Sequence, residues 1–300
     1  MTILIVKNAS VKREGSDLLV KWRDKSVTVS VADLELVIII GSNVNMSSEV
    51  LLFLSSQNVP VAIHGKYSDV VLVSPFMNSM SDVRSKQYCM SEDRKIILAK
   101  RFIEGKVRGM FNVAKYFGYL NQIEVKVEEL DLRGVNDLNS LRLIEAEYGR
   151  KAWDELKKFL PREFTGRKPR NEDPINRAID YAYSIIYSLC THALIAVGLD
   201  PYAGVMHSNF PGRLSFTYDF SEMFKPVAVH VVISSSRRVK LSLDKKGYLS
   251  KESAEYITKY LYTILRKKKV RSAIYRLAYK VRKFVTDLVD FEPFIYKPKG

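Results

Sequence analysis

Ser74-Pro75-Phe76-Met77-Asn78-Ser79-Met80-Ser81 divides the chain into two parts whose apolar residues follow different periods. Pro75 and the Ser/Asn cluster suit neither a strand nor a helix, so this stretch predicts a linker, taken as residues 75–85. Before it, short apolar runs alternate with turn signals. After it, apolar residues recur every three or four positions. The pattern predicts an α+β fold, with a small N-terminal β domain carrying one helix and a larger all-α C-terminal domain.

The part before the linker predicts a β domain over residues 1–74. One helix is expected to begin at an N-cap at Ser47 or Ser48 and to continue through Leu54. Six β-branched or alternating runs predict strands: Thr2–Lys7, Leu18–Trp22, Val27–Val31, Leu36–Ile40, Val59–Ile63 and Val70–Val73.

The part after the linker, residues 86–300, predicts a helical domain. Asp93–Phe117, Asp137–Leu160 and Ile175–Val197 have helical spacing, and the third is apolar on most sides, which is typical of a central helix. A hairpin is expected around Phe224–Leu243. A final helix is expected to run from an N-cap at Ser250 towards Asp290, with a break near Lys267.

Composition excludes several classes of protein. The two cysteines, Cys89 and Cys190, provide neither a disulfide framework nor a Cys-rich zinc site. The sequence has no signal-peptide pattern and no apolar run of membrane-spanning length, so we expect a cytoplasmic protein with no membrane partner. The sequence contains no P-loop, GxGxxG or GxSxG motif, which argues against a nucleotide-driven motor, a dehydrogenase and an α/β-hydrolase.

The basic charge is concentrated at one end of the chain. The net charge is +15, yet residues 1–75 hold seven Lys/Arg against seven Asp/Glu, whereas residues 237–300 hold eighteen against six. Such an imbalance indicates a polyanionic partner, most often nucleic acid. The densest run predicts nucleic-acid contacts from Arg266, Lys267, Lys268, Lys269 and Arg271. The alternative interpretation is a solvated helix face.

Glu145 lies within an apolar helical stripe. In the helix expected over Asp137–Leu160, the stripe contains Leu141, Tyr148 and Ala152, and Glu145 falls among them. A carboxylate on a packing face is unfavourable unless it is paired, protonated or bound to a cation. Glu145 is therefore either one half of a buried salt bridge or a metal ligand. Glu147 is expected to face solvent.

A second group of chemically active residues follows the central helix. His207 comes after a turn-rich stretch, and Asp219 and Glu222 are three residues apart, so one helical turn places these two side by side. Two acids and an imidazole suit Mg²⁺ or Mn²⁺ better than zinc. Taken singly, Asp219 is more typical of a helix cap and His207 of a core histidine than either is of a catalytic residue.

Ordered motifs along the whole chain resemble the CRISPR-associated spacer-acquisition integrases, the universal "first" Cas proteins. The similarity begins with the runs Val29–Ile38 and Val59–Gly65 and is strongest in the second part of the chain. The motifs there are Arg84–Gln87, Arg94–Lys106, Ile144–Trp153, Asp173–Asn176, Tyr181–Ser184, Gly198–Pro201, Gly204–His207 and Leu214–Glu222. Three positions depart from the family's common pattern: Glu222 replaces Asp, Lys225 replaces Arg and His230 replaces Asp.

The resemblance implies a metal-dependent DNA endonuclease and integrase that inserts spacers into a CRISPR array during adaptation. It implies Glu145, His207 and Glu222 as ligands of Mg²⁺ or Mn²⁺, with Asp219 supporting or sharing the catalytic site. The implied partners are double-stranded and branched DNA, a second copy of the chain bound through the β domain, and a small second Cas protein that bridges two dimers. Two competing interpretations remain: a non-catalytic nucleic-acid-binding scaffold, and an RNA-processing nuclease.

Overall fold

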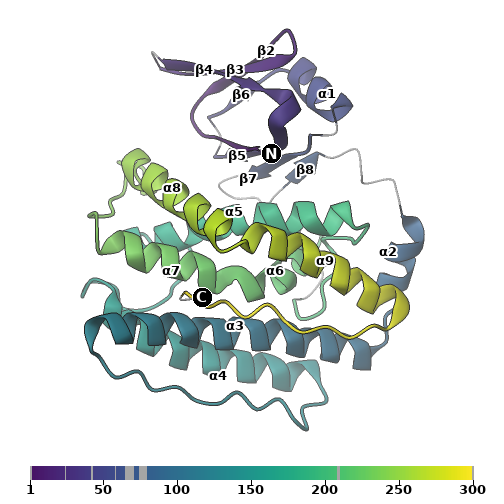
Figure 1. The fold of residues 1–300 in the computed structure, drawn as a ribbon, viewed down its shortest axis with the longest axis vertical. Coiled ribbons are helices and arrows are strands. Elements are labelled where there is room, and N and C mark those ends of the chain that lie inside the picture. The colour runs from purple at the N-terminus through teal and green to yellow at the C-terminus, as the bar shows by residue number, and fades with distance from the viewer. Residues whose placement is uncertain are drawn as a thin grey trace.

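The fold consists of a strand-rich N-terminal part followed by a mostly helical part (Figure 1), as predicted. The computed structural model describes residues 2–23, 25–41, 43–57, 59–64, 71–73, 80–207 and 210–298. Residues 75–79 of the expected linker and Val70 of the last expected strand lie outside these ranges, and residues 81–85 belong to a helix. The domain boundaries at 74 and 86 remain predictions.

The N-terminal part contains two four-stranded sheets with the orders β1-β5-β7-β8 and β4-β3-β2-β6. Their strands are β1 (Thr2–Val6), β2 (Ser10–Glu14), β3 (Asp17–Trp22), β4 (Lys25–Ser30), β5 (Leu34–Ile40), β6 (Asn45–Met46), β7 (Val61–His64) and β8 (Val71–Val73). Helix α1 (Ser48–Ser56) begins after Ser47, whose hydroxyl accepts a hydrogen bond from the Val50 amide, as the N-cap prediction requires. Strands β2 and β6 were not predicted, since β2 is mostly polar and β6 has two residues.

Strand β5 connects the two parts of the fold because it is buried on both faces. Leu36 and Ile38 belong to the core shared with the helices, whereas Val37 and Ile39 belong to the core beneath the second sheet. Successive side chains of a strand point to opposite faces, so an uninterrupted apolar strand can serve two cores. The first sheet therefore packs on the helices, and its attachment does not depend on the linker alone.

The helical part is built around α3 and α5, each of which has more buried residues than any other described helix. Its helices are α2 (Ser81–Tyr88), α3 (Glu92–Asn121), α4 (Leu138–Leu156), α5 (Pro174–Ala196), α6 (Ser215–Ser221), α7 (Lys225–Ser236), α8 (Lys251–Lys267) and α9 (Val270–Asp287), with single 3₁₀ turns η3 (Lys157–Phe159) and η4 (Glu222–Phe224). The break near Lys267 is confirmed. Within the described ranges, no helix is both long and apolar enough to cross a membrane.

The predicted hairpin around Phe224–Leu243 is wrong, because Lys225–Ser236 form helix α7. The valine-rich sequence favoured a strand, but nearly every residue of α7 is buried among α3, α5 and α8. A helix buried on all sides has no polar face and therefore no amphipathic signal. Pro226 in its first turn was the available helix-start signal.

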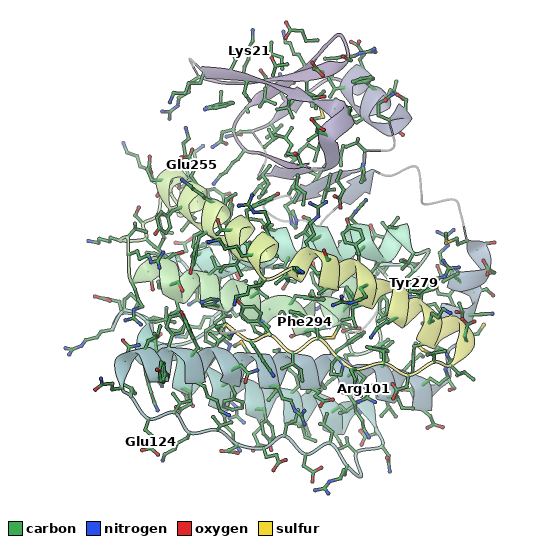
Figure 2. The ribbon with its side chains drawn as sticks, viewed as in Figure 1. Lys21, Arg101, Glu124, Glu255, Tyr279 and Phe294 are labelled. Atoms are coloured by element: carbon green, nitrogen blue, oxygen red, sulfur yellow. The ribbon has the colours of Figure 1, made fainter. Side chains whose placement is uncertain are left out.

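The chain after α9 continues as an extended segment, residues 288–298, that runs lengthwise along α3 (Figure 2). Phe294 stacks on Phe224 with ring centroids 4.8 Å apart, and the Asn112 side chain of α3 donates a 2.9 Å hydrogen bond to the carbonyl of Tyr296. Arg101 of α3 pairs with Asp290. This extended segment closes one side of the helical core.

Three buried histidines link elements that are distant in sequence. Each imidazole shares a hydrogen bond with a hydroxyl on another element, in the pairs His64–Ser188, His192–Tyr275 and His230–Tyr296. Burial lowers the pKa of each imidazole to about 4. All three are therefore neutral in the folded chain at neutral pH.

The histidines predict acid sensitivity. In the unfolded chain their pKa values return to about 6.5, so between about pH 6.5 and 4 the unfolded state binds more protons and folding stability falls as pH falls. His230→Asn is expected to flatten this slope by up to about 1.4 kcal/mol per pH unit, measured by urea unfolding across that range. Tyr296→Phe is the control: it removes the partner hydroxyl and keeps the titrating ring, so the slope should persist. An unchanged slope in His230→Asn would contradict the conclusion that the lowered pKa of His230 makes folding stability fall as pH falls.

A second prediction concerns Gly105 of α3. A Cβ atom there would lie 2.6 Å from Met223 Cγ and 2.7 Å from the Phe294 carbonyl oxygen, so α3, η4 and the extended segment meet at backbone distance. Gly105→Ala is expected to destabilise the chain by about 1–3 kcal/mol in denaturant unfolding. In the control Gly149→Ala the nearest atom is 3.9 Å away, and the helix should gain about 0.5–1 kcal/mol. Stabilisation by both substitutions would rule out the close approach.

Candidate active site

Glu145 and Glu222 are brought together by Lys106. Lys106 lies on α3, Glu145 on α4 and Glu222 at the start of η4. The Lys106 ammonium forms an ion pair with Glu145 Oε1 and lies 2.7 Å from Glu222 Oε2. Two of the three carboxylates that sequence analysis selected, Glu145 and Glu222, therefore meet around one cation, although they are far apart in the chain.

Glu222 is the most deeply buried carboxylate of this pair, with a side chain 4% exposed. It also forms an ion pair with Lys225, one turn further on. Burial alone raises the pKa of a carboxyl group, but the two ammonium groups outweigh burial and hold the pKa of Glu222 at about 2. Burial alone lowers the pKa of an amine, yet the two carboxylates raise that of Lys106 above its usual value. Glu222 and Lys106 are therefore both charged at neutral pH.

Asp219 organises the segment that carries His207. Its carboxylate is fully buried and accepts hydrogen bonds from the backbone amides of Val205 (2.6 Å), Met206 (2.9 Å) and His207 (3.1 Å). The His207 imidazole donates from Nδ1 to the same carboxylate. With Nδ1 committed to Asp219, Nε2 is the ring nitrogen left for a ligand or a proton.

Arg142 fastens the His207 segment to α4. Its Nε and Nη2 donate hydrogen bonds of 2.8 and 2.6 Å to the carbonyl of Met206, the residue before His207. Arg142 precedes Glu145 by one helical turn, so the same helix supplies the carboxylate and a clamp on the histidine segment.

Aromatic rings lie between the Glu145–Glu222 pair and the His207–Asp219 pair. Lys225 Nζ lies 5.9 Å from the ring centre of Tyr187, which packs edge-on against Tyr218 at 4.9 Å. Tyr218 in turn contacts His207, with ring centres 6.2 Å apart. We call Lys106, Glu145, His207, Asp219 and Glu222 the candidate cluster below.

The cluster fits a divalent cation in chemistry. Within the described ranges, no three His, Cys, Asp or Glu side chains are gathered as a ready metal-binding group. However, Glu222 Oε2 is buried and accepts no well-aligned hydrogen bond, although Lys106 Nζ is 2.7 Å away. An oxygen in that state, beside a second carboxylate and already next to an ammonium, is suited to Mg²⁺ or Mn²⁺.

Sequence analysis overlooked Lys106 and Arg142. Lys106 falls on the buried face of α3 between Phe102, Ile103 and Met110, which are all buried. A charged residue inside an apolar stripe is the same signal that selected Glu145. Arg142 is exposed and carried no comparable signal.

The predicted nucleic-acid-binding run lies on different elements, around the junction of α8 and α9. Arg266, Lys267 and Lys269 are exposed, and Lys268 is half-buried. Arg271 is half-buried and forms an ion pair with Glu35 of β5. Arg266, Lys269 and Arg271 line a cleft of about 1490 Å³ between β1 and these helices.

Comparison with known proteins identifies the family. The family model described as CRISPR associated protein Cas1 matches residues 3–276. The CRISPR-associated endonuclease Cas1 of Hyperthermus butylicus is 29% identical over 296 residues, covering 89% of this chain and 89% of the relative. A casposase bound to an integration product has a similar structure, with a TM-score of 0.87 at 22% identity, covering 100% of this chain and 94% of the casposase.

A Cas6-RT-Cas1–Cas2 complex contains a similar domain, with a TM-score of 0.78 at 17% identity over 100% of this chain and 36% of the other. At such low sequence identities, the similarity to these two structures shows a shared fold. The family model covers far more than half of the sequence and includes every residue of the candidate cluster. The chain therefore belongs to the Cas1 family of CRISPR-associated proteins.

Proposed function

We propose that this protein is a metal-dependent DNA endonuclease and integrase that inserts spacers into a CRISPR array during adaptation. The observation that carries the proposal is the convergence of Glu145 and Glu222 on one cation position. The endonuclease name of the Hyperthermus relative and the integration product of the casposase support the reaction class.

Glu145, Glu222 and His207 are the proposed ligands of Mg²⁺ or Mn²⁺. When bound, such an ion supplies charge stabilisation at the scissile phosphate. Asp219 is proposed to hold His207 in one orientation through Nδ1, which leaves Nε2 for ligation or proton transfer. Arg142 keeps the His207 segment against α4. Lys225 balances the charge of Glu222.

The proposed partners are double-stranded and branched DNA, a second copy of this chain and a small second Cas protein. The net charge of +15 supports DNA binding, and the similarity to a Cas1–Cas2 complex supports the second protein. For the homodimer, the β domain is the proposed interface: β4 is an edge strand with mostly exposed side chains, and such edges readily pair with another chain.

The first test is strand joining on a branched DNA substrate with Mn²⁺ or Mg²⁺. Glu145→Ala and Glu222→Ala are each expected to reduce the rate by more than about 100-fold, because losing a direct ligand costs more than losing its supporting partner. Glu147→Ala is the matched control on the same helix: Glu147 is exposed and paired with Lys151, so activity should be unchanged.

Full activity in Glu145→Ala would refute the proposed site. A wild-type protein that binds DNA equally with and without metal, and joins no strands, would favour the non-catalytic scaffold. Preferential cleavage of single-stranded RNA would favour the RNA-processing nuclease.

The second test concerns the basic run. If Lys267 and Lys269 each contact a phosphate, the double variant Lys267→Ala/Lys269→Ala should reduce the slope of log K against log salt by about 2, measured by fluorescence anisotropy with duplex DNA. Arg271→Ala is the contrast: since Arg271 is paired with Glu35, its loss should lower stability more than the salt slope. An unchanged slope in the double variant would show that Lys267 and Lys269 face solvent and contact no phosphate of the bound DNA.

A further inference from the structure

We propose that Lys106 is a built-in counter-ion that occupies the metal position of the cation-free chain and has to leave it when a divalent ion binds. The inference rests on the proposed function and assigns Lys106 a role within it. Its basis is that one ammonium contacts both candidate carboxylate ligands, Glu145 on α4 and Glu222 on η4.

The backbone around Lys106 fixes the start of its side chain. The adjacent Gly105 packs so closely that a Cβ atom would lie 2.6 Å from Met223 Cγ, and Met223 follows Glu222 directly. Helix α3 therefore cannot withdraw from η4 without unpacking the core. Only the flexible four-carbon stem of Lys106 can move the ammonium away from the carboxylates.

The charge balance makes displacement necessary. Lys106 and Lys225 together cancel the charges of Glu145 and Glu222. A divalent ion that entered with both lysines in place would bring two positive charges to a pair of carboxylates whose charges are already cancelled, while the third carboxylate, Asp219, is committed to three backbone amides and the His207 ring. Such an excess is unfavourable where water is scarce. Departure of one ammonium restores a net negative site and also vacates the space between the two carboxylates.

Lys106 is the lysine that leaves, because Lys225 is held by other contacts. Lys225 forms its ion pair with Glu222 and lies over the rings of Tyr183 and Tyr187, at 5.4 and 5.9 Å from their centres. Cation–π contacts of this kind retain an ammonium independently of the carboxylates. Lys106, by contrast, is the group positioned between the two proposed ligands.

The test is a titration of Mn²⁺ into DNA-free protein, with free Mn²⁺ measured by electron paramagnetic resonance. Lys106→Met keeps the length of the side chain and removes the charge. It is expected to bind Mn²⁺ at least about tenfold more tightly than the wild type, within the usual range of coupling between competing sites. Mn²⁺ should also raise its Tm more than it raises that of the wild type.

Two controls separate displacement from a general change in charge. Lys115→Met makes the same substitution at an exposed position of α3, and its Mn²⁺ affinity should match the wild type. Lys225→Met removes an ammonium that does not lie between the two ligands, and its effect should be smaller than that of Lys106→Met.

Equal or weaker Mn²⁺ binding by Lys106→Met would overturn the inference. If Lys106→Met is unfolded without metal, Lys106→Gln retains a polar group and is measured instead, with the same criterion. Failure of the proposed function gives a different result: metal-dependent joining would survive in Glu145→Ala and Glu222→Ala, whatever the Mn²⁺ affinity of the Lys106 variants.

Discussion

The ion pair between Lys106 and buried Glu222 is the constraint around which the helical part is arranged. A carboxylate with 4% exposure requires a cation that the fold delivers from another element. Helix α3 delivers it, and the contact of Gly105 with Met223 shows how closely α3 has to approach η4 for the ammonium to reach. Glu145 of α4 then completes the balance. Charge compensation and helix packing are therefore satisfied by the same geometry.

The histidine side of the site is built on a different principle. The Asp219 carboxylate accepts hydrogen bonds from three backbone amides and one imidazole N–H, all of which are polarised donors. Hydrogen bonds of this kind fix a loop more firmly than a single ion pair, because each one restrains a different backbone atom. The oxygens of Glu222 thus contact cations. The oxygens of Asp219, three residues earlier, instead accept the hydrogen bonds that position the His207 segment. Both side chains are buried, so their neighbours determine this difference.

The sequence was sufficient to predict the change from strands to helices and the break near Lys267, because both depend on local periodicity and turn residues. It was also sufficient to select Glu145, since a charge in an apolar stripe is visible without a structure. Helix α7 was mistaken for a hairpin because a helix buried on every side has no amphipathic period to detect. The meeting of Glu145 with Glu222 depends on how three helical elements pack, so the residue pattern alone could not predict it, and only the resemblance to known integrases implied it. The roles of the cluster residues and of the basic run remain predictions.

The extended segment after α9 has a consequence for the order in which the chain becomes structured during synthesis. Tyr296 bonds His230, 66 residues earlier, and its neighbour Phe294 covers Phe224 beside the cluster. Domains generally become structured from the N-terminus as they leave the ribosome. Here the β domain can form early, but the surface of α3 and α7 stays uncovered until the last of these aromatic residues has emerged. The candidate cluster, beside which Phe294 packs on Phe224, therefore reaches its final packing only after residues 294–296 have emerged.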